Sequence, residues 1–370
     1  MRSRTVGVAL LVAGLQLGCR TPDRYVPGPD ARESDAIGDA GGDGDYDASR
    51  TSAADAAAEG AEVARQAPDG ASTSDMASIA DGCSGDCTPP AVIANAIVPA
   101  NGSTGVRSDT KISIAFSEPM NQQTTEAAFA SADIPSRTYS WDSSGTILTV
   151  TPAGGLAYAT GTDPALAARS YSFSITTTAT DLAGNHLQAG SAVTFSTLRK
   201  ITLEVGVVPQ MSGNVADGGE TIVDDRWASA GCDANEENRA FVTFNLAGLP
   251  PAITAVDGAE LVLMDNTTAP PSTPGVVVSV GHILFSTTGP SLFGSQSDAL
   301  GTLSRSGQIS RMTNNALRDA VWADYGDRTN RANRSQYRMR VEVQCPSTPA
   351  NARSDYDPQL SRLSITYLIK

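Results

Sequence analysis

Short stretches of alternating apolar and polar residues begin near residue 90 and recur to the end of the chain. Alternation with a period of two is typical of a strand that buries one face. Turn-forming sequences at 99–102, 142–145 and 183–185 separate the first of these stretches. Several short strands within about 110 residues predict a β-sandwich over 89–198. The residues expected to face its core are Ile112, Ile114, Phe116, Leu148, Val150, Tyr171, Phe173, Ile175, Val193 and Phe195.

The remaining residues, 199–370, continue the β pattern with one exception. In 314–325, Leu317, Val321 and Tyr325 recur every four residues, which predicts one short helix. Many strands and one helix favour a jelly-roll sandwich, so the expected fold class is all-β, with two sandwiches. Alternation is clear at 242–246, 260–264, 276–280, 336–343 and 362–367.

The N-terminus has the pattern of an export signal. Arg2 and Arg4 precede an apolar stretch over 6–17, which ends at Gly18 and Cys19. A transmembrane anchor is the alternative, but the stretch is shorter than the about 20 residues that span a bilayer. The pattern therefore predicts a signal peptide over 1–18.

The junction Leu15-Gln16-Leu17-Gly18-Cys19 resembles a bacterial lipoprotein signal. It departs from the family pattern, which has Leu where Gln16 stands. The resemblance implies that acyl chains on Cys19 anchor the protein to a membrane. Because Arg20 stands where inner-membrane lipoproteins usually have Asp, it also implies the outer membrane of a Gram-negative bacterium and the cell surface. Secretion with Cys19 free or removed is the alternative.

Residues 19–88 differ sharply in composition from the rest of the chain. Positions 20–88 hold 15 acidic residues against five arginines and few bulky apolar side chains. Such a segment buries too little surface to offset its chain entropy, so we expect a disordered acidic tether that acts as a spacer. A polyacidic metal sink is the weaker alternative. Near its end, the spacing of Cys83 and Cys87 predicts a small local disulfide, with a metal pair as the alternative.

The segment 89–198 resembles the bacterial Ig-like domain of S-layer and other surface proteins. The resemblance implies a spacer or adhesive role and no catalysis. Asp181 and Asn185 are candidate Ca²⁺ ligands or turn caps, and Trp141 is a candidate sugar platform or packing residue. The matching sequences lie at 99–106, 112–120, 141–142, 148–152, 181–185 and 194–197.

The segment 199–370 more distantly resembles the DNRLRE-type jelly-roll modules and related carbohydrate-binding modules of bacterial surface proteins. Some members of that family bind polysaccharide, so Trp227, Trp322 and Tyr325 are candidate glycan contacts, with core or helix packing as the alternative. The acidic residues of 217–237 are candidates for a structural Ca²⁺ site or for a solvated loop. The matching sequences lie at 239–246, 249–251, 259–263, 337–341 and 363–367.

The chain has five cysteines, an odd number that a lipidated Cys19 would explain. Cys232 precedes one predicted strand and Cys345 follows another. We expect these two to form a disulfide, because paired thiols are stable in an oxidising compartment. A zinc site or a catalytic thiol is the weaker alternative, since no histidine is close in sequence.

The formal net charge is −14, with 26 Lys and Arg against 40 Asp and Glu, which excludes a general binder of the nucleic-acid backbone. Most of this acidity belongs to the tether. There are two histidines, His186 in a predicted turn and His282 in a predicted strand, and common catalytic motifs are missing from the sequence. We therefore expect no catalytic residue and no cofactor, and a structural Ca²⁺ stays an open alternative. Three hypotheses stay open: a surface lipoprotein that binds glycan, an adhesive protein with protein partners, and a polysaccharide-acting enzyme.

Overall fold

The computed structural model describes residues 85–370, except 225, 234, 269–271, 343 and 346–351. The predicted signal peptide, Cys19, Cys83 and the tether up to residue 84 lie outside the described residues. The buried apolar side chains of the described residues form three clusters, one before residue 198 and two after it. In the described part of the chain, no helix is long and apolar enough to cross a membrane.

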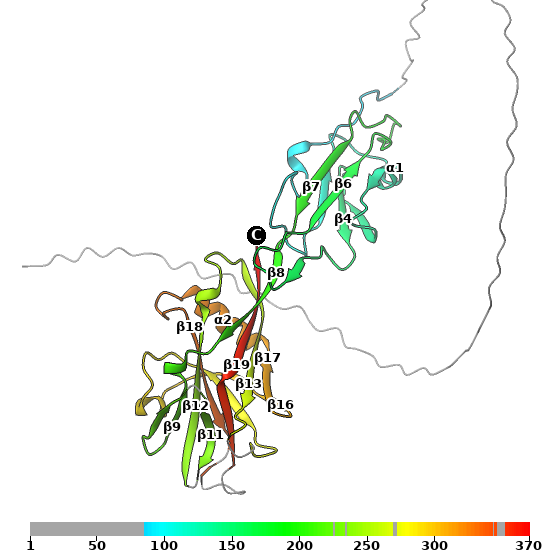
Figure 1. Ribbon diagram of the computed structural model, residues 1–370. Helices are drawn as coiled ribbons and strands as arrows, with labels where there is room; N and C mark the ends of the chain where they lie inside the picture. Colours follow the sequence, from blue (N-terminus) through cyan, green and yellow to red (C-terminus); the bar gives the residue numbers. More distant parts are fainter. Residues whose placement is uncertain (1–84, 225, 234, 269–271, 343, 346–351) are drawn as a thin grey trace, which may run out of the picture. The chain divides into compact units, whose positions relative to one another are not determined.

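The first domain contains two three-stranded antiparallel sheets, one with the strand order β1-β4-β3 and one with β2-β6-β7 (Figure 1). This arrangement confirms the expected sandwich. The strands of the first sheet are β1 (Ile112–Ala115), β4 (Ile147–Pro152) and β3 (Arg137–Trp141). Those of the second are β2 (Phe129–Ala130), β6 (Ser170–Ile175) and β7 (Ser191–Ser196).

The core of the first domain is the set of alternating residues that the sequence indicates. All ten of the predicted core residues are buried, and Ile112 pairs with Val150 while Ile114 pairs with Leu148 across β1 and β4. Helix α1 (Gln122–Ala128) was not predicted, because its polar sequence has no apolar periodicity. The side chain of Asn121 caps it by accepting a hydrogen bond from the backbone of Thr124.

The second domain is built on a sheet of thirteen strands in the described residues, of which twelve come from 199–370 and one, β5 (Ala159–Gly161), comes from the first domain. The sheet folds over, so that β12, β14 and β18 pack through one core against β8, β13 and β19. Strand β11 (Ala228–Asp233) joins the two layers by pairing with β12 and with β19. The all-β sandwich class is thereby confirmed, while the likeness to the DNRLRE-type jelly roll stays a prediction.

The strands of the second domain are divided between two layers. One layer contains β9 (Gly213–Ala216), β10 (Thr221–Val223), β12 (Glu236–Asn245), β14 (Val278–His282), β15 (Asp298–Thr302) and β18 (Arg334–Val341). The other contains β8 (Arg199–Gly206), β13 (Ala255–Asp265), β16 (Ser304–Ser306), β17 (Ile309–Thr313) and β19 (Arg353–Ile369), and β5 (Ala159–Gly161) pairs with β8. Short 3₁₀ turns are η1 (Ala94–Ala96), η2 (Pro209–Met211), η3 (Leu246–Gly248) and η4 (Pro290–Leu292).

Helix α2 (Asn315–Gly326) confirms the single helix expected in this domain. Asn314 caps it, with its side chain accepting a hydrogen bond of 2.8 Å from the backbone of Leu317. Leu317, Val321 and Tyr325 are buried, as their spacing predicts. The helix packs against β13 and β18.

Candidate functional site

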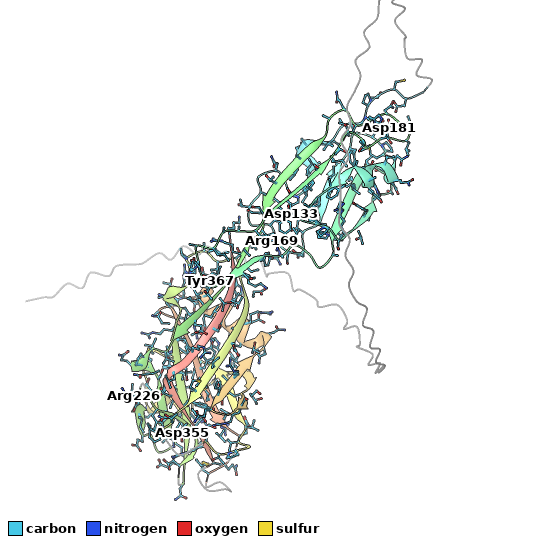
Figure 2. All side chains as sticks on the ribbon, turned by 45° about the vertical axis from the view of Figure 1, so that its right-hand side comes forward. Asp133, Arg169, Asp181, Arg226, Asp355 and Tyr367 are labelled. Carbon is cyan, nitrogen blue, oxygen red and sulfur yellow. A yellow bond between two sulfur atoms is a disulfide. The ribbon has the colours of Figure 1, made fainter. Side chains whose placement is uncertain are left out.

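The aromatic residues proposed as glycan contacts lie at opposite ends of the second domain. The indole nitrogen of Trp227 donates to the carboxylate of Asp355, near the start of β19. The hydroxyl of Tyr325 accepts a hydrogen bond from the backbone amide of Ile253. The next residue, Thr254, donates its backbone amide to the carbonyl of Leu368, near the end of β19. Thirteen residues of strand separate these points, a length of about 40 Å. Figure 2 shows Arg226 and Asp355 at one end of this domain and Tyr367 at the other. Trp227 therefore cannot share one site with Trp322 and Tyr325.

On helix α2, Trp322 and Tyr325 form a stack whose ring centroids are 5.6 Å apart, with 10° between the planes. Tyr325 is buried at 8% exposure, and its hydroxyl donates to the carbonyl of Pro250 at 2.8 Å. It therefore acts as a packing residue. Trp322 is 41% exposed and rests on Tyr325, so its indole remains accessible to a partner.

At the other end of the domain, Trp227 borders a small polar cavity of about 130 Å³, which we call the Asn214 cavity. It brings together Trp227 and three acidic side chains of the stretch 217–237, which the sequence analysis had treated separately. The lining residues are Asn214, Ala216, Glu220, Ile222, Trp227, Ser229, Asp233, Glu236, Asn238 and Arg353.

Strand pairing places the two asparagines on one face of the sheet. Asn214 of β9 lies opposite Ala240 of β12, and Ala216 lies opposite Asn238, so the two amides are diagonal neighbours. The amide nitrogen of Asn214 donates to the amide oxygen of Asn238 at 2.8 Å. Gly213 has φ +141°, and a Cβ there would lie 1.9 Å from the carbonyl oxygen of Ile222, so only glycine allows β9 and β10 to pair this closely.

One cation and several anions give the Asn214 cavity its charge. The guanidinium of Arg353 lies 3.2 Å from a carboxylate oxygen of Asp233 and 3.0 Å from one of Asp355. Glu220 and Glu236 add two more carboxyl groups to the lining. Since Arg353 is shared with Asp355, the cavity is acidic in balance.

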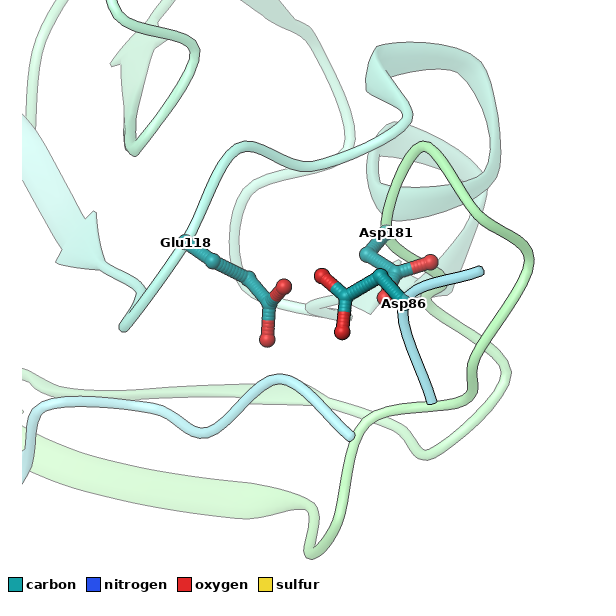
Figure 3. Close-up of side chains that lie close together, drawn as sticks. All are labelled: Asp86, Glu118 and Asp181. Atoms are coloured by element: carbon teal, nitrogen blue, oxygen red, sulfur yellow. The ribbon is translucent and has the colours of Figure 1, made fainter. Parts of the chain in front are cut away.

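In the first domain, three carboxylates from distant segments meet at one point (Figure 3). Asp86, Glu118 and Asp181 each offer an oxygen atom, and these atoms lie within 4.8 Å of one another. Desolvation, followed by the negative charges of Asp86 and Asp181, raises the pKa of Glu118. The sequence indicated Asp181 alone, because the other two residues come from loops far away in the chain.

Asp181 also holds a turn, one of its two roles considered from the sequence. Its carboxylate accepts hydrogen bonds from the backbone and the side-chain amide of Asn185, at 2.8 and 2.7 Å. Desolvation opposes ionisation of Asp181, but hydrogen bonds from Asn185 and from the backbone of the turn lower its pKa. The amide nitrogen of Asn185 also donates to the backbone carbonyl of Asp86 at 2.9 Å. Trp141 is a packing residue, because its ring stacks on Phe116 with the centroids 6.2 Å apart.

A buried polar group that the sequence did not indicate lies between α2, β14 and β18. The Nε2 atom of His282 lies 2.9 and 3.0 Å from the two carboxylate oxygens of Asp324. Arg331 forms an ion pair with the same carboxylate at 2.5 Å, and the hydroxyl of Ser335 donates to it at 2.6 Å. The serine thus bonds the carboxylate and not the imidazole, which differs from the order of contacts in a Ser-His-Asp triad. These contacts connect helix α2 to strands β14 and β18.

The disulfide expected between Cys232 and Cys345 is confirmed, with 5.5 Å between the two Cα atoms. It links β11 to the segment that follows β18. The expected Cys83–Cys87 bridge stays a prediction, because Cys83 lies outside the described residues.

Comparison with known proteins identifies the first domain. No curated protein matches the chain significantly. Two solved structures of the surface layer protein SbsC, one a crystal structure and one of its domains 1–6, match with 13% and 12% identity and TM-scores of 0.20 and 0.21. Each match covers 61% of this chain and 32% of that protein, so the chain spans about a third of its length. The family described as "Bacterial Ig-like domain" matches residues 86–197, so the first domain is a bacterial Ig-like domain by sequence and by its two-sheet fold.

Proposed function

We propose that this protein is an exported, lipid-anchored surface protein in which the Ig-like domain serves as a spacer and the second domain binds a glycan. The observation that carries the proposal is the Cys232–Cys345 disulfide, since structural disulfides persist in oxidising compartments outside the cytosol. The match of residues 86–197 to the bacterial Ig-like family supports the same location. Cys19 would attach the chain to the outer membrane.

Two features of the second domain support glycan binding. Trp322 presents a partly exposed indole of the kind on which sugar rings stack, and the Asn214 cavity is lined by amide and carboxylate side chains that could bond to hydroxyls. The expectation that the module is not catalytic is part of this proposal. The His282–Asp324 group supports it, because its carboxylate is occupied by Arg331 and Ser335 and is fully buried.

The location is tested by expressing the full chain in a Gram-negative host and fractionating the cells. We expect the protein in the outer-membrane fraction, with acyl chains on Cys19 detected by mass spectrometry. The Cys19→Ala variant should appear in a soluble fraction with its Cys232–Cys345 bridge intact. Recovery of the unmodified chain with reduced cysteines from the cytosol would overturn the proposal.

Glycan binding is tested on a glycan array with the full chain carrying Cys19→Ala, which lacks the lipid attachment. The expected result is binding to bacterial polysaccharides, weakened when Trp322 is replaced by Ala. Leu360→Ala, which truncates a 54% exposed apolar side chain elsewhere in the same domain, is the matched control. An array without any signal would instead favour an adhesive role with protein partners.

A further inference from the structure

We propose that the Asn214 cavity binds a terminal, uncharged sugar residue. This inference rests on the proposed function and deepens it, because it gives the glycan a binding site and a chemical class. The site lies at the end of the second domain opposite to Trp322.

The first observation is a buried amide atom without a partner. Asn214 is 4% exposed, and its side-chain oxygen has no hydrogen-bond partner in the structure, while its nitrogen donates to Asn238. Exchanging oxygen and nitrogen in both amides would preserve the bond between them and leave the nitrogen of Asn214 unpaired instead. In either orientation, one buried polar atom of Asn214, a residue that lines this cavity, lacks a hydrogen-bond partner, and such a group destabilises the fold unless water or a ligand pairs with it.

The second observation is the mixture of groups around that atom. Carboxylates accept hydrogen bonds from hydroxyls, and Glu220, Asp233 and Glu236 surround the amide pair. The single cation in the lining, Arg353, is already engaged by Asp233 and Asp355. An acidic sugar would therefore meet net repulsion, whereas a neutral sugar would find acceptors for its hydroxyls.

The arrangement of the acids argues against a metal ion. Among the described residues, Asp86, Glu118 and Asp181 place their oxygens close enough together to share a cation. Glu220, Asp233 and Glu236 do not meet that criterion. Their ligand atoms therefore do not all come within 4.8 Å of one another, the separation that defines a candidate cation site.

The size of the cavity limits the ligand to a small part of a glycan. Its volume is about 130 Å³, which is room for a few water molecules. Typical ligand pockets measure about 300–1,000 Å³. The cavity can therefore take one hydroxyl-bearing edge of a sugar ring at a chain end, with the indole of Trp227 as part of the wall.

The test is a titration of the full chain carrying Cys19→Ala with a polysaccharide that it binds on the array, and with the neutral sugars of its chain ends. Binding is followed by calorimetry and by saturation-transfer NMR. We expect Asn214→Ala and Asn238→Ala each to weaken binding at least tenfold, and Glu236→Gln to weaken it several-fold. Glu342→Gln removes the same charge at an exposed position outside the cavity and should bind as the parent chain does. A uronic acid should not compete with the neutral sugar.

The outcomes separate the site from the function. If the polysaccharide binds and the variants, shown by thermal melting to be folded, bind it equally well, the cavity holds structural water and the inference is overturned. Loss of binding in Trp322→Ala alone would place the glycan at the other end and also overturn it. Saturation of the cavity by Ca²⁺, with no effect of sugar on the variants, would replace the sugar by a cation. A parent chain that binds no glycan overturns the proposed function itself.

Discussion

The two domains are both β-sandwiches, yet their interiors differ in chemistry. Among the described residues, three polar or charged residues are buried before residue 199, namely Thr125, Asp181 and Thr197, and fifteen are buried after it. The Ig-like core consists of aliphatic and aromatic side chains at every second position of its paired strands, and the sequence pattern indicates these positions. The second domain holds buried ion pairs, amide pairs and a disulfide within its fold.

This difference indicates where specificity arises in each domain. An apolar core needs the correct pattern and volume, and it tolerates moderate substitutions. A buried polar group needs its own partner in the correct place, and losing that partner is costly. The second domain should therefore be the more sensitive to single changes, and the predictions below test that contrast from the largest effect to the smallest.

The largest effect is expected from removing the Cys232–Cys345 disulfide. The two residues are 113 positions apart. The chain-entropy relation for a loop of that length predicts a loss of about 4–5 kcal/mol in the free energy of unfolding for the double variant Cys232→Ala, Cys345→Ala. Hydrogen exchange measured by mass spectrometry should show faster exchange in 199–370 and unchanged exchange in 86–197. Equal acceleration in both domains would contradict their separate stability.

The next largest effect is expected at the buried carboxylate of helix α2. Asp324→Asn leaves the guanidinium of Arg331 buried without its counter-charge, which should cost about 3 kcal/mol in the free energy of unfolding. Asp319→Asn is the matched control on the same helix, because that side chain is 66% exposed and should change stability by less than about 0.5 kcal/mol. Urea denaturation measures both, and similar midpoints for the two variants would show that the buried group contributes little.

A smaller loss is expected in the core of the Ig-like domain. Ile114→Val removes one buried methylene group from a fully buried position and should cost about 1 kcal/mol. Ile147→Val, at a position that is 37% exposed, should cost less. An equal loss in the free energy of unfolding from Ile114→Val in the first domain and from Asp324→Asn in the second would contradict the contrast between the two interiors.

The smallest effect is expected from the carboxylates of the Ig-like domain and depends on pH. The pKa of Glu118 is raised in the folded state, so its protonated form stabilises the fold at low pH, and this contribution is lost as the pH rises through the raised pKa. Glu118→Gln should therefore raise the melting temperature near pH 7 and have little effect near pH 3.

Asp142 provides a control of opposite sign. A hydrogen bond from the hydroxyl of Ser144, followed by backbone amides, lowers the pKa of Asp142 to about 2. Its stabilisation is present above the ordinary pKa and is lost as the pH falls toward 2, so Asp142→Asn should lower the melting temperature near pH 7. Repeating both melts with Ca²⁺ tests Asp181 as a candidate Ca²⁺ ligand: a cation shared by Asp86, Glu118 and Asp181 would stabilise the parent chain more than Glu118→Gln.

Most of the Ig-like domain was predictable because its core residues follow an alternating pattern within each strand. A spacing of two residues predicts that one face of a strand contains Ile112, Ile114 and Phe116, and all three are buried. The same holds for Tyr171, Phe173 and Ile175. Helix α1 escaped prediction because it is short and polar, and because a side-chain cap from Asn121 starts it. Strand β12 also departs from simple alternation, since residues on both of its faces are buried, Val242 in the main core and Phe241 in a second cluster.

The sequence by itself determined the all-β class, the succession of two sandwiches and the helix of residues 314–325. These follow from periodicity and turn residues, which are local properties. Cysteine parity left four cysteines to pair, and the structure decided that Cys232 pairs with Cys345. Only the tertiary structure decided that Trp227 and Trp322 lie at opposite ends, that Asn214 meets Asn238, and that His282 meets Asp324. Those contacts join residues 24 to 42 positions apart through strand register and packing, and no spacing along the chain specifies them.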